Sequence, residues 1–218
     1  MIEVSHIRKK YGAKQVLCDI SFRVQSGENV AIVGKNGCGK STLLQVMAGI
    51  LKHDAGQITY YGEQSSRKRR NFCGYVPQEN PLMEQLSVRD NLRLWGGGGE
   101  GAPASVLQEF ELQDILDMQV EKLSGGMKRR LCIACAALEG KPILLLDEPT
   151  TSLDLYYKEK IQMWLASYRK KNGIIVMTTH EEEEILGADR CFVMQDGQLQ
   201  EIPPGQKTMT RIRELIGQ

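Results

Sequence analysis

The feature that most constrains the fold of this chain is the segment VGKNGCGKST at residues 33–42. Gly34, four further residues and then Gly39-Lys40-Ser41 satisfy the pattern GxxxxGK(S/T). An apolar run of strand length precedes the segment. Apolar residues at helical spacing follow it, namely Leu43, Leu44, Val46, Met47 and Ile50. A strand, a glycine-rich loop and a helix in this order predict a phosphate-binding loop.

The chemistry of this loop follows from its residue types. Glycines let backbone N–H groups turn inward around a phosphate, and the N-terminus of the next helix favours negative charge. Lys40 can reach the β- and γ-phosphates of a nucleotide, Ser41 can ligate Mg²⁺ and Thr42 can add a phosphate contact. A purely structural glycine turn is the alternative, which the strand–loop–helix setting disfavours. We therefore predict a nucleoside triphosphate site that includes Gly34, Asn36, Gly37, Cys38, Gly39, Lys40, Ser41 and Thr42.

A second feature is the sequence ILLLDEPTTSLD at residues 143–154. Asp147 ends a hydrophobic run of strand length, where its carboxylate can hold Mg²⁺ through water. Glu148 follows directly and can orient or deprotonate an attacking water. An acidic pair at a strand end is more often a solvated terminus. With a phosphate loop upstream, the catalytic interpretation is favoured.

The order of apolar segments predicts an α/β fold. Continuous apolar runs at 142–149 and 173–180 are typical of central parallel strands that are covered on both faces. Further strands are expected within 2–12 and 15–24, as an antiparallel pair, within 56–64 and 72–78, and as a hairpin over 191–202 with its turn at Asp196-Gly197. Helical spacing recurs over 104–122 in Val106, Leu107, Phe110, Leu112, Ile115 and Leu116.

These segments predict one domain over residues 1–218. Its P-loop NTPase core, a mostly parallel sheet flanked by helices with an antiparallel β part, is expected to comprise 1–79 and 134–218. A helical insert is expected at about 80–133, with a flexible glycine-rich connection at 96–103.

Charge and hydropathy narrow the classes of function. The 28 basic and 27 acidic residues leave a formal net charge of +1, so no global basic field attracts nucleic acid. No apolar run approaches the roughly 20 residues that span a bilayer, and the N-terminus lacks the apolar stretch of a secretory signal. A cytoplasmic chain is expected, with any membrane work done through a partner.

Cysteine usage agrees with a reduced compartment. Only Cys132 and Cys135 form a CxxC pair, and they lie in a run that is typical of a helix. A redox or metal site needs a helix N-terminus after a strand or a second ligand pair, and neither is visible. We interpret both as buried small hydrophobes.

The segment LSGGMKRRL, which begins at Leu123, carries a family resemblance. It matches the LSGG signature, and essentially the whole chain resembles the nucleotide-binding domain of an ATP-binding cassette (ABC) transporter. Further family elements appear in order: Tyr11 matches the aromatic that stacks on adenine, Val16 its apolar neighbour, Gln78 the glutamine loop, Ser152 to Asp154 the D-loop, and His180 the switch histidine.

The resemblance implies a mechanism. Two such domains would pack head to tail, with ATP between the P-loop of one and the LSGG segment of the other. Ser124, Gly125 and Gly126 would thus serve a γ-phosphate bound mainly by the opposite subunit, with Asp154 also at the nucleotide. The implied catalytic residues are Lys40, Gln78, Glu148 and His180, and the implied Mg²⁺ ligands are Ser41, Gln78 and Asp147.

The resemblance also suggests a subfamily. Met127 stands where the family usually has glutamine, but the LSGG anion contacts do not depend on that side chain. The segments LSGGMKRRL, DEPTTSLD and LSVRDNL most resemble those of ATPase subunits that export drugs, polysaccharides or lipids. The ATPase subunit of haem exporters is nearly as good a match.

Other segments have plainer interpretations. The basic run at 65–71 is expected to be a solvated loop, and the acidic run at 181–184 to open a helix rather than bind zinc. Trp95 and the pair Tyr60-Tyr61 are expected to pack. Two interpretations stay equal for Leu82, Met83, Leu86 and Leu92: the groove where this family receives a helix of its membrane partner, or the core of the insert.

Two classes of function remain. The first is the ATP-hydrolysing subunit of an exporter, which acts with a second ABC ATPase subunit (a copy or a sister chain) and an integral membrane subunit that selects the cargo. The second is a soluble ABC ATPase in translation or DNA repair, which usually brings a tandem cassette, a coiled-coil insertion or a basic extension. A regulatory module without turnover is disfavoured by Glu148.

Overall fold

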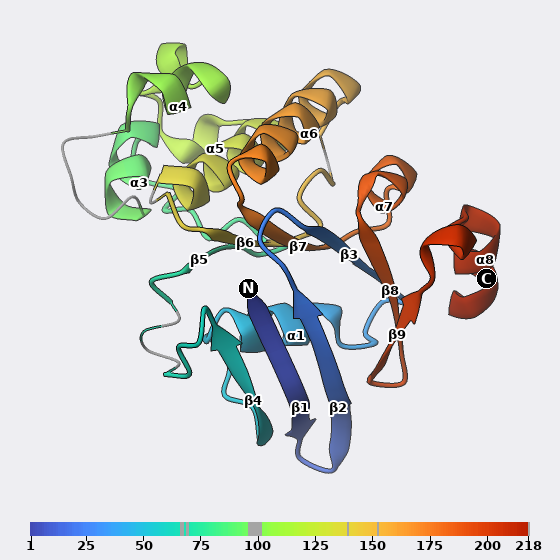
Figure 1. Cartoon of the computed structure of the whole chain (residues 1–218). Helices are drawn as coiled ribbons and strands as arrows, with labels where there is room; N and C mark the ends of the chain where they lie inside the picture. Colours follow the sequence, from blue (N-terminus) through green and yellow to red (C-terminus); the bar gives the residue numbers. More distant parts are fainter. Residues whose placement is uncertain (66–67, 69, 96–101, 139, 152, 218) are drawn as a thin grey trace.

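The chain folds around two sheets with helices between and above them (Figure 1). The computed structural model describes residues 1–65, 68, 70–95, 102–138, 140–151 and 153–217. Most of the expected flexible connection at 96–103 and part of the basic run at 65–71 lie outside these residues. No helix in the described ranges is both long and apolar enough to cross a membrane.

The smaller sheet is antiparallel. In the described chain its strand order is β2-β1-β4, with β1 at Ile2–Tyr11, β2 at Lys14–Val24 and β4 at Ala55–Tyr60. Register pairs such as Ile2–Val24 and Ile2–Tyr60 confirm the expected pairing of the first two segments and add β4 beside them.

The larger sheet is mainly parallel, as the apolar runs predicted. Its order is β5-β6-β7-β3-β8-β9. The strands are β3 (Asn29–Val33), β5 (Cys73–Val76), β6 (Ile143–Asp147), β7 (Ile174–Thr178), β8 (Arg190–Gln195) and β9 (Gln198–Ile202). The first five strands in this order run parallel, and β9 returns antiparallel to β8. Asp196 and Gly197 adopt left-handed φ values of 49° and 72°, which suit the two-residue turn.

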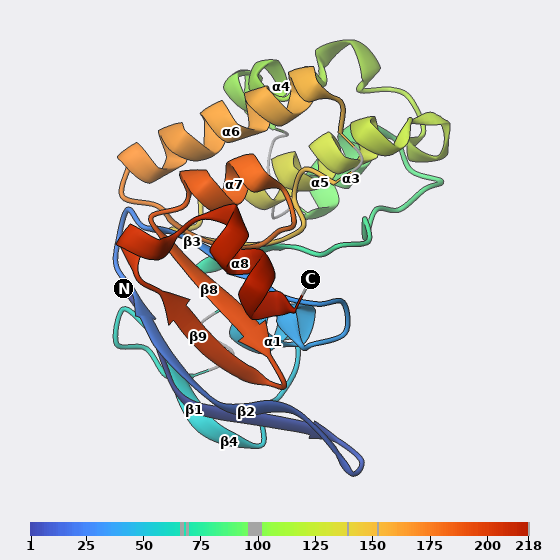
Figure 2. The same cartoon turned by 90° about the vertical axis from the view of Figure 1, so that its right-hand side faces the viewer.

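Helices cover both faces of the parallel sheet (Figures 1 and 2). Helix α1 lies between the sheets, while α3, α4, α5 and α6 form a layer on the other side. Helices α7 and α8 pack beside β3 and β8. Their bounds are α1 Lys40–Met47, α3 Val88–Trp95, α4 Ala104–Glu109, α5 Gly125–Leu138, α6 Leu155–Lys170, α7 Glu182–Gly187 and α8 Met209–Ile216.

Alternation along β6 shows how each face is filled. Leu145 packs into the cluster that contains α1, whereas Leu144 and Leu146 pack into the cluster that contains α3, α5 and α6. All three leucines are buried, because the period of two along a strand sends successive side chains to opposite covered faces. The continuous apolar run therefore reflects two cores.

Two expectations about helices are wrong. Helix α1 ends at Met47 and Gly49 adopts a left-handed φ of 73°, so Ile50 lies beyond the helix and is 55% exposed. The region 104–122 is not one helix. After α4, Glu111 takes a left-handed φ of 50°, and short 3₁₀ turns follow at Gln113–Ile115 and Val120–Lys122.

The buried cysteines behave as expected. Cys132 and Cys135 lie in α5 as free, buried thiols. Burial raises the pKa of Cys132 to about 11 and also raises the pKa of Cys135, so both remain protonated and unreactive at neutral pH.

Glu111 joins the segment after α4 to α6. Its carboxylate accepts hydrogen bonds from Lys160, from Tyr156 at 2.9 Å and from Tyr157 at 3.0 Å. The hydrogen bond from Lys160, followed by those from the tyrosines, lowers the pKa of Glu111 to about 2. The left-handed turn at Glu111 thus directs a charged side chain toward α6.

We predict that Glu111→Gln destabilises the protein in a pH-dependent way. A depressed carboxyl pKa contributes stability above its unfolded value of about 4.3, and this contribution is lost as the pH falls toward 2. Thermal unfolding should show a Tm lower than the parent's by about 2–4 °C at pH 7, with a smaller gap at about pH 4. Glu109→Gln, at an exposed carboxylate two residues earlier, is the control. An equal gap at both pH values would contradict the prediction.

Candidate active site

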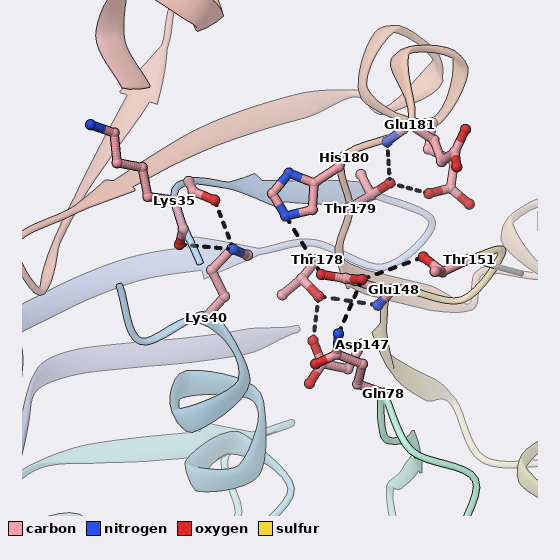
Figure 3. A network of polar contacts seen from close by, with 12 residues as sticks. Lys35, Lys40, Gln78, Asp147, Glu148, Thr151, Thr178, Thr179, His180 and Glu181 are labelled. Atoms are coloured by element: carbon pink, nitrogen blue, oxygen red, sulfur yellow. Dashed lines mark hydrogen bonds and ion pairs between the residues drawn. The ribbon is translucent and has the colours of Figure 1, made fainter. Parts of the chain in front are cut away.

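The phosphate loop joins the end of β3 to the start of α1. Lys40 is buried at the first position of α1, and its ammonium donates to the carbonyl oxygens of Gly34 at 2.7 Å and Lys35 at 3.2 Å (Figure 3). A Cβ on Gly34 would lie 2.3 Å from the Met194 carbonyl oxygen, so no larger residue fits there. The loop is therefore folded tightly against β8 with its lysine already turned inward.

A cavity of about 440 Å³ opens above this loop. Its wall includes residues from the phosphate loop, from the small sheet and from the ends of β5 and β6. The lining residues are Tyr11, Val16, Asn36, Gly37, Gly39, Lys40, Ser41, Thr42, Gln78 and Glu148. The structure thus brings together most of the residues that sequence reasoning assigned to the nucleotide, from segments far apart in the chain.

Two predicted loop residues lie off this cavity wall. Gly34 is buried at the end of β3, and Cys38 is half-buried and packs against the core cluster. At the other end of the cavity, Tyr11 is about half exposed, with the Lys9 ammonium 5.5 Å from its ring centroid. An exposed aromatic face at the mouth of a phosphate cavity suits a stacked base.

Asp147 lies buried at the end of β6. Its Oδ1 accepts a 2.5 Å hydrogen bond from the hydroxyl of Thr178, which ends the neighbouring strand β7 (Figure 3). The register pairs the same two residues across the ladder. The sheet therefore fixes this carboxylate beside the phosphate loop.

Glu148 adopts a left-handed φ of 50°, which is strained for a residue with a side chain. Its N–H donates to the Thr178 carbonyl oxygen at 3.0 Å. The carboxylate is held from other sides by Gln78 Nε2 at 3.3 Å and Thr151 Oγ1 at 3.4 Å. The Nε2 atom of His180, which follows β7, lies 3.5 Å from Glu148 Oε1 (Figure 3). Predicted catalytic residues from three loops thus meet at one carboxylate.

The LSGG segment does not line this cavity. Ser124 and Gly125 are exposed at the start of α5, and Ser124 Oγ accepts a hydrogen bond from the Met127 N–H at 3.2 Å. Asp154 caps α6 by accepting from the Tyr157 N–H at 3.0 Å. None of Ser124, Gly125, Gly126 and Asp154 lines the cavity above the chain's own phosphate loop.

Sequence reasoning missed several residues at the site. Thr151 and Thr178 hold the two carboxylates, and Arg129 of α5 donates to the carbonyl oxygens beneath them. The one signal for Arg129 was its position four residues before Ile133, on the buried face of α5. No local signal marks the threonines.

Glu184 was interpreted only as part of an acidic helix start. It does lie in the first turn of α7, but its carboxyl is buried between the hydroxyls of Thr150, at 2.8 Å, and Thr179. Burial raises the pKa of Glu184. The residue links the loop after Glu148 to the loop that carries His180.

Comparison with known proteins gives a consistent result. Residues 17–151 match the ABC transporter family. The sulfate/thiosulfate import ATP-binding protein CysA of Pseudomonas aeruginosa is 37% identical over 94% of this chain and 67% of its own length. The Nod factor export ATP-binding protein I of Rhizobium etli is 38% identical over 99% and 71%, and the linearmycin resistance ATP-binding protein LnrL of Bacillus subtilis is 32% identical over 95% and 70%.

Solved structures agree in fold. A dimeric ATP-binding cassette in a post-hydrolysis state, bound to ADP and Pi, superposes with a TM-score of 0.85 and 26% identity over 94% of this chain and 99% of that one. An ATP-binding subunit of an ABC transporter gives 0.86 and 28% identity over 100% and 93%. The chain belongs to the ABC transporter family, as an ATP-binding subunit with ATPase activity.

We predict that Glu184→Gln gains stability relative to the parent as the pH rises. A carboxyl whose pKa is raised by folding stabilises the fold below its unfolded pKa, and this contribution is lost as the pH rises through the folded pKa. Glutamine keeps the shape without the charge. Thermal unfolding should show that the Tm of the variant minus the Tm of the parent is larger at about pH 8 than at about pH 5. Exposed Glu183→Gln is the control, and a difference that ignores pH would contradict the prediction.

Proposed function

We propose that this ATPase drives export through a separate membrane subunit, with Glu148 acting on the attacking water. The observation that carries the catalytic part is the convergence of Gln78 and His180 on the carboxylate of Glu148, a residue that lines the cavity together with Lys40. Export is supported by the resemblance of the LSGGMKRRL and LSVRDNL segments to exporter subunits, and by a relative named for Nod factor export.

The residues around the cavity suit Mg²⁺. Ser41 and Gln78 line the cavity, and Asp147 directly precedes Glu148, which also lines it. The Ser41 hydroxyl, the Gln78 amide oxygen and the Asp147 carboxylate are hard oxygen donors, which this cation prefers. Asp147 is buried and held by Thr178, so it reaches the site with little freedom left to lose. We propose these three residues as its direct or water-mediated ligands. When bound, Mg²⁺ neutralises charge on the β- and γ-phosphates.

The protein's own groups then have separate roles. The backbone N–H groups of the phosphate loop and the Lys40 ammonium, at the wall of the cavity, would bind the phosphates and stabilise negative charge. Glu148 accepts a hydrogen bond from the attacking water and orients it. The side chain of Glu148 is only 13% exposed, so its carboxylate acts with little competition from bulk solvent, whereas His180 is 46% exposed and free to contact a bound γ-phosphate.

A second subunit completes the site in this proposal. The LSGG segment, with the exposed N-terminus of α5 behind it, is suited to bind an anion presented by another chain. Asp154 is likewise exposed, at the N-cap of α6. One chain would thus bind ATP with its phosphate loop and serve a second ATP with Ser124, Gly125 and Gly126. The similar cassette with ADP and Pi is itself dimeric.

A groove of about 450 Å³ beside β5 is the proposed contact for the membrane subunit. Leu82 and Trp95 line it together with Pro77, next to Gln78. Of the residues left open by sequence, Leu92 belongs to the core of the insert, while Met83 and Leu86 are exposed. A helix in this groove would contact the loop that carries Gln78. We propose that residues 80–133 transmit movement between the groove and the nucleotide.

Glu148→Gln tests the catalytic assignment. The variant should bind ATP with unchanged affinity, because the phosphate contacts remain, and lose turnover by about 100-fold or more. Single-turnover hydrolysis and nucleotide-binding titrations measure the two effects. With ATP present, size-exclusion chromatography should show a trapped dimer. Hydrolysis at the parent rate would remove Glu148 from this role.

Co-purification of the tagged chain from native membranes with ATP tests the transport assignment. A multi-span membrane protein in the eluate is the expected result. A Leu82→Glu variant, which places charge in the groove, should lose that protein and keep basal ATPase activity. Ribosomal or DNA-repair proteins in place of a membrane protein would favour the soluble class instead.

A further inference from the structure

Arg129 lies one helical turn inside α5, buried beneath two catalytic loops. One loop carries Gln78 after β5, and the other carries Glu148 after β6. The guanidinium donates to the carbonyl oxygens of Pro77 (2.5 Å), Gln78 (3.4 Å), Asp147 (2.6 Å), Glu148 (2.9 Å) and Pro149 (2.9 Å), and to Oδ1 of Asn80 (3.4 Å).

These contacts begin where the pairing of β5 with β6 ends and the two loops start. The parallel register between β5 and β6 ends at Val76 and Leu146. Beyond that pair, buried carbonyl oxygens need other donors, because an unpaired buried carbonyl costs free energy. Arg129 supplies them with one rigid group. Its Nη1 reaches the first loop, while its Nη2 and Nε reach the second.

The distance between Gln78 and Glu148 therefore depends on a residue that touches neither side chain. Gln78 Nε2 lies 3.3 Å from Glu148 Oε2, and the guanidinium holds the main chain on both sides of that contact. Holding the Glu148 carbonyl also restrains the strained backbone at φ 50°. A shift of either loop would move a catalytic side chain relative to the cavity.

We propose that Arg129 is a positioning residue for ATP hydrolysis, which fixes the loop of Gln78 against the loop of Glu148. Since Arg129 is part of the helix that starts at the LSGG segment, the same contacts tie both loops to that segment. The inference rests on the catalytic roles proposed above for Gln78 and Glu148. It adds that α5 sets their spacing from within the chain.

Lysine cannot replace this arginine. A guanidinium presents N–H donors in a planar fork that can reach two loops at once, whereas an ammonium is a single point of charge. Arg129→Lys keeps the charge and nearly the length but loses one of the two loops. A matched control exists at Arg130, which is equally buried on the same helix but donates to the Phe110 carbonyl and stacks on Tyr157.

The test compares Arg129→Lys with Arg130→Lys in the full chain. Arg129→Lys should lower kcat by at least about tenfold, because small misplacements of catalytic groups are costly. Its Kd for ATP should stay within about twofold, since Arg129 does not line the cavity above the phosphate loop. Arg130→Lys should keep kcat within about twofold while its Tm falls as much as that of Arg129→Lys. An Arg129→Lys enzyme with the parent kcat would overturn the proposal.

A double-mutant cycle with Gln78→Ala separates positioning from general structure. If Arg129 acts by holding Gln78 against Glu148, Arg129→Lys should lower kcat by no more than about threefold in a Gln78→Ala background. Equal factors in both backgrounds, or a loss of ATP affinity that matches the loss of kcat, would overturn the proposal. Should Arg129→Lys fail to fold, Arg129→Gln enters the same cycle. Glu148→Gln is measured in parallel. If Glu148→Gln keeps the parent turnover while Arg129→Lys loses it, the proposed role of Glu148 is wrong, and this outcome is distinct from a failure of the Arg129 proposal.

Discussion

Parallel pairing of β3, β6 and β7 is the constraint on which the active site depends. Residues at the carboxyl ends of neighbouring parallel strands meet at one edge, and here the register places Ile32 and Asp147 on either side of Thr178. The phosphate loop starts just beyond that edge. Because both faces of these strands are buried, a one-residue slip would send leucines to the wrong core. Core packing thus fixes the position of the Asp147 carboxylate.

The strain at Glu148 illustrates how the surrounding contacts decide the geometry. A left-handed conformation at a non-glycine residue costs about 1–3 kcal/mol. Hydrogen bonds hold its main chain on both sides, including one from its N–H to the Thr178 carbonyl oxygen and one from Arg129 to its own carbonyl oxygen. A neutral bond contributes about 1 kcal/mol and a charged one about 1.5–3 kcal/mol, enough to offset the strain. The turn directs the Glu148 side chain toward Gln78 and His180, away from the buried path of β6.

Sequence patterns predicted those features that local residues determine. The glycine loop, the apolar strands and the hairpin at Asp196 were read correctly, because each pattern reflects its own backbone requirement or burial on both faces. The contacts of Arg129 and Glu184 were not predicted, because the partners that surround each of these buried charged residues are distant in sequence. Arg129 pairs with Pro77 across 52 residues, and Glu184 with Thr150 across 34. The break at Glu111 was missed because helical spacing continues on both sides of it.

Two adjacent arginines connect α5 to two different parts of the structure. Arg129 donates to the catalytic loops, while Arg130 donates to the Phe110 carbonyl oxygen at the end of α4, and its guanidinium lies 3.8 Å from the centroid of the Tyr157 ring of α6. Removing the partner of a buried charge costs about 3–5 kcal/mol. Because these contacts are costly to break, we expect α5 and the two catalytic loops to move together with the segment around Phe110. Glu148 and the LSGG segment, which serve different nucleotides in the proposed dimer, would then move as one body.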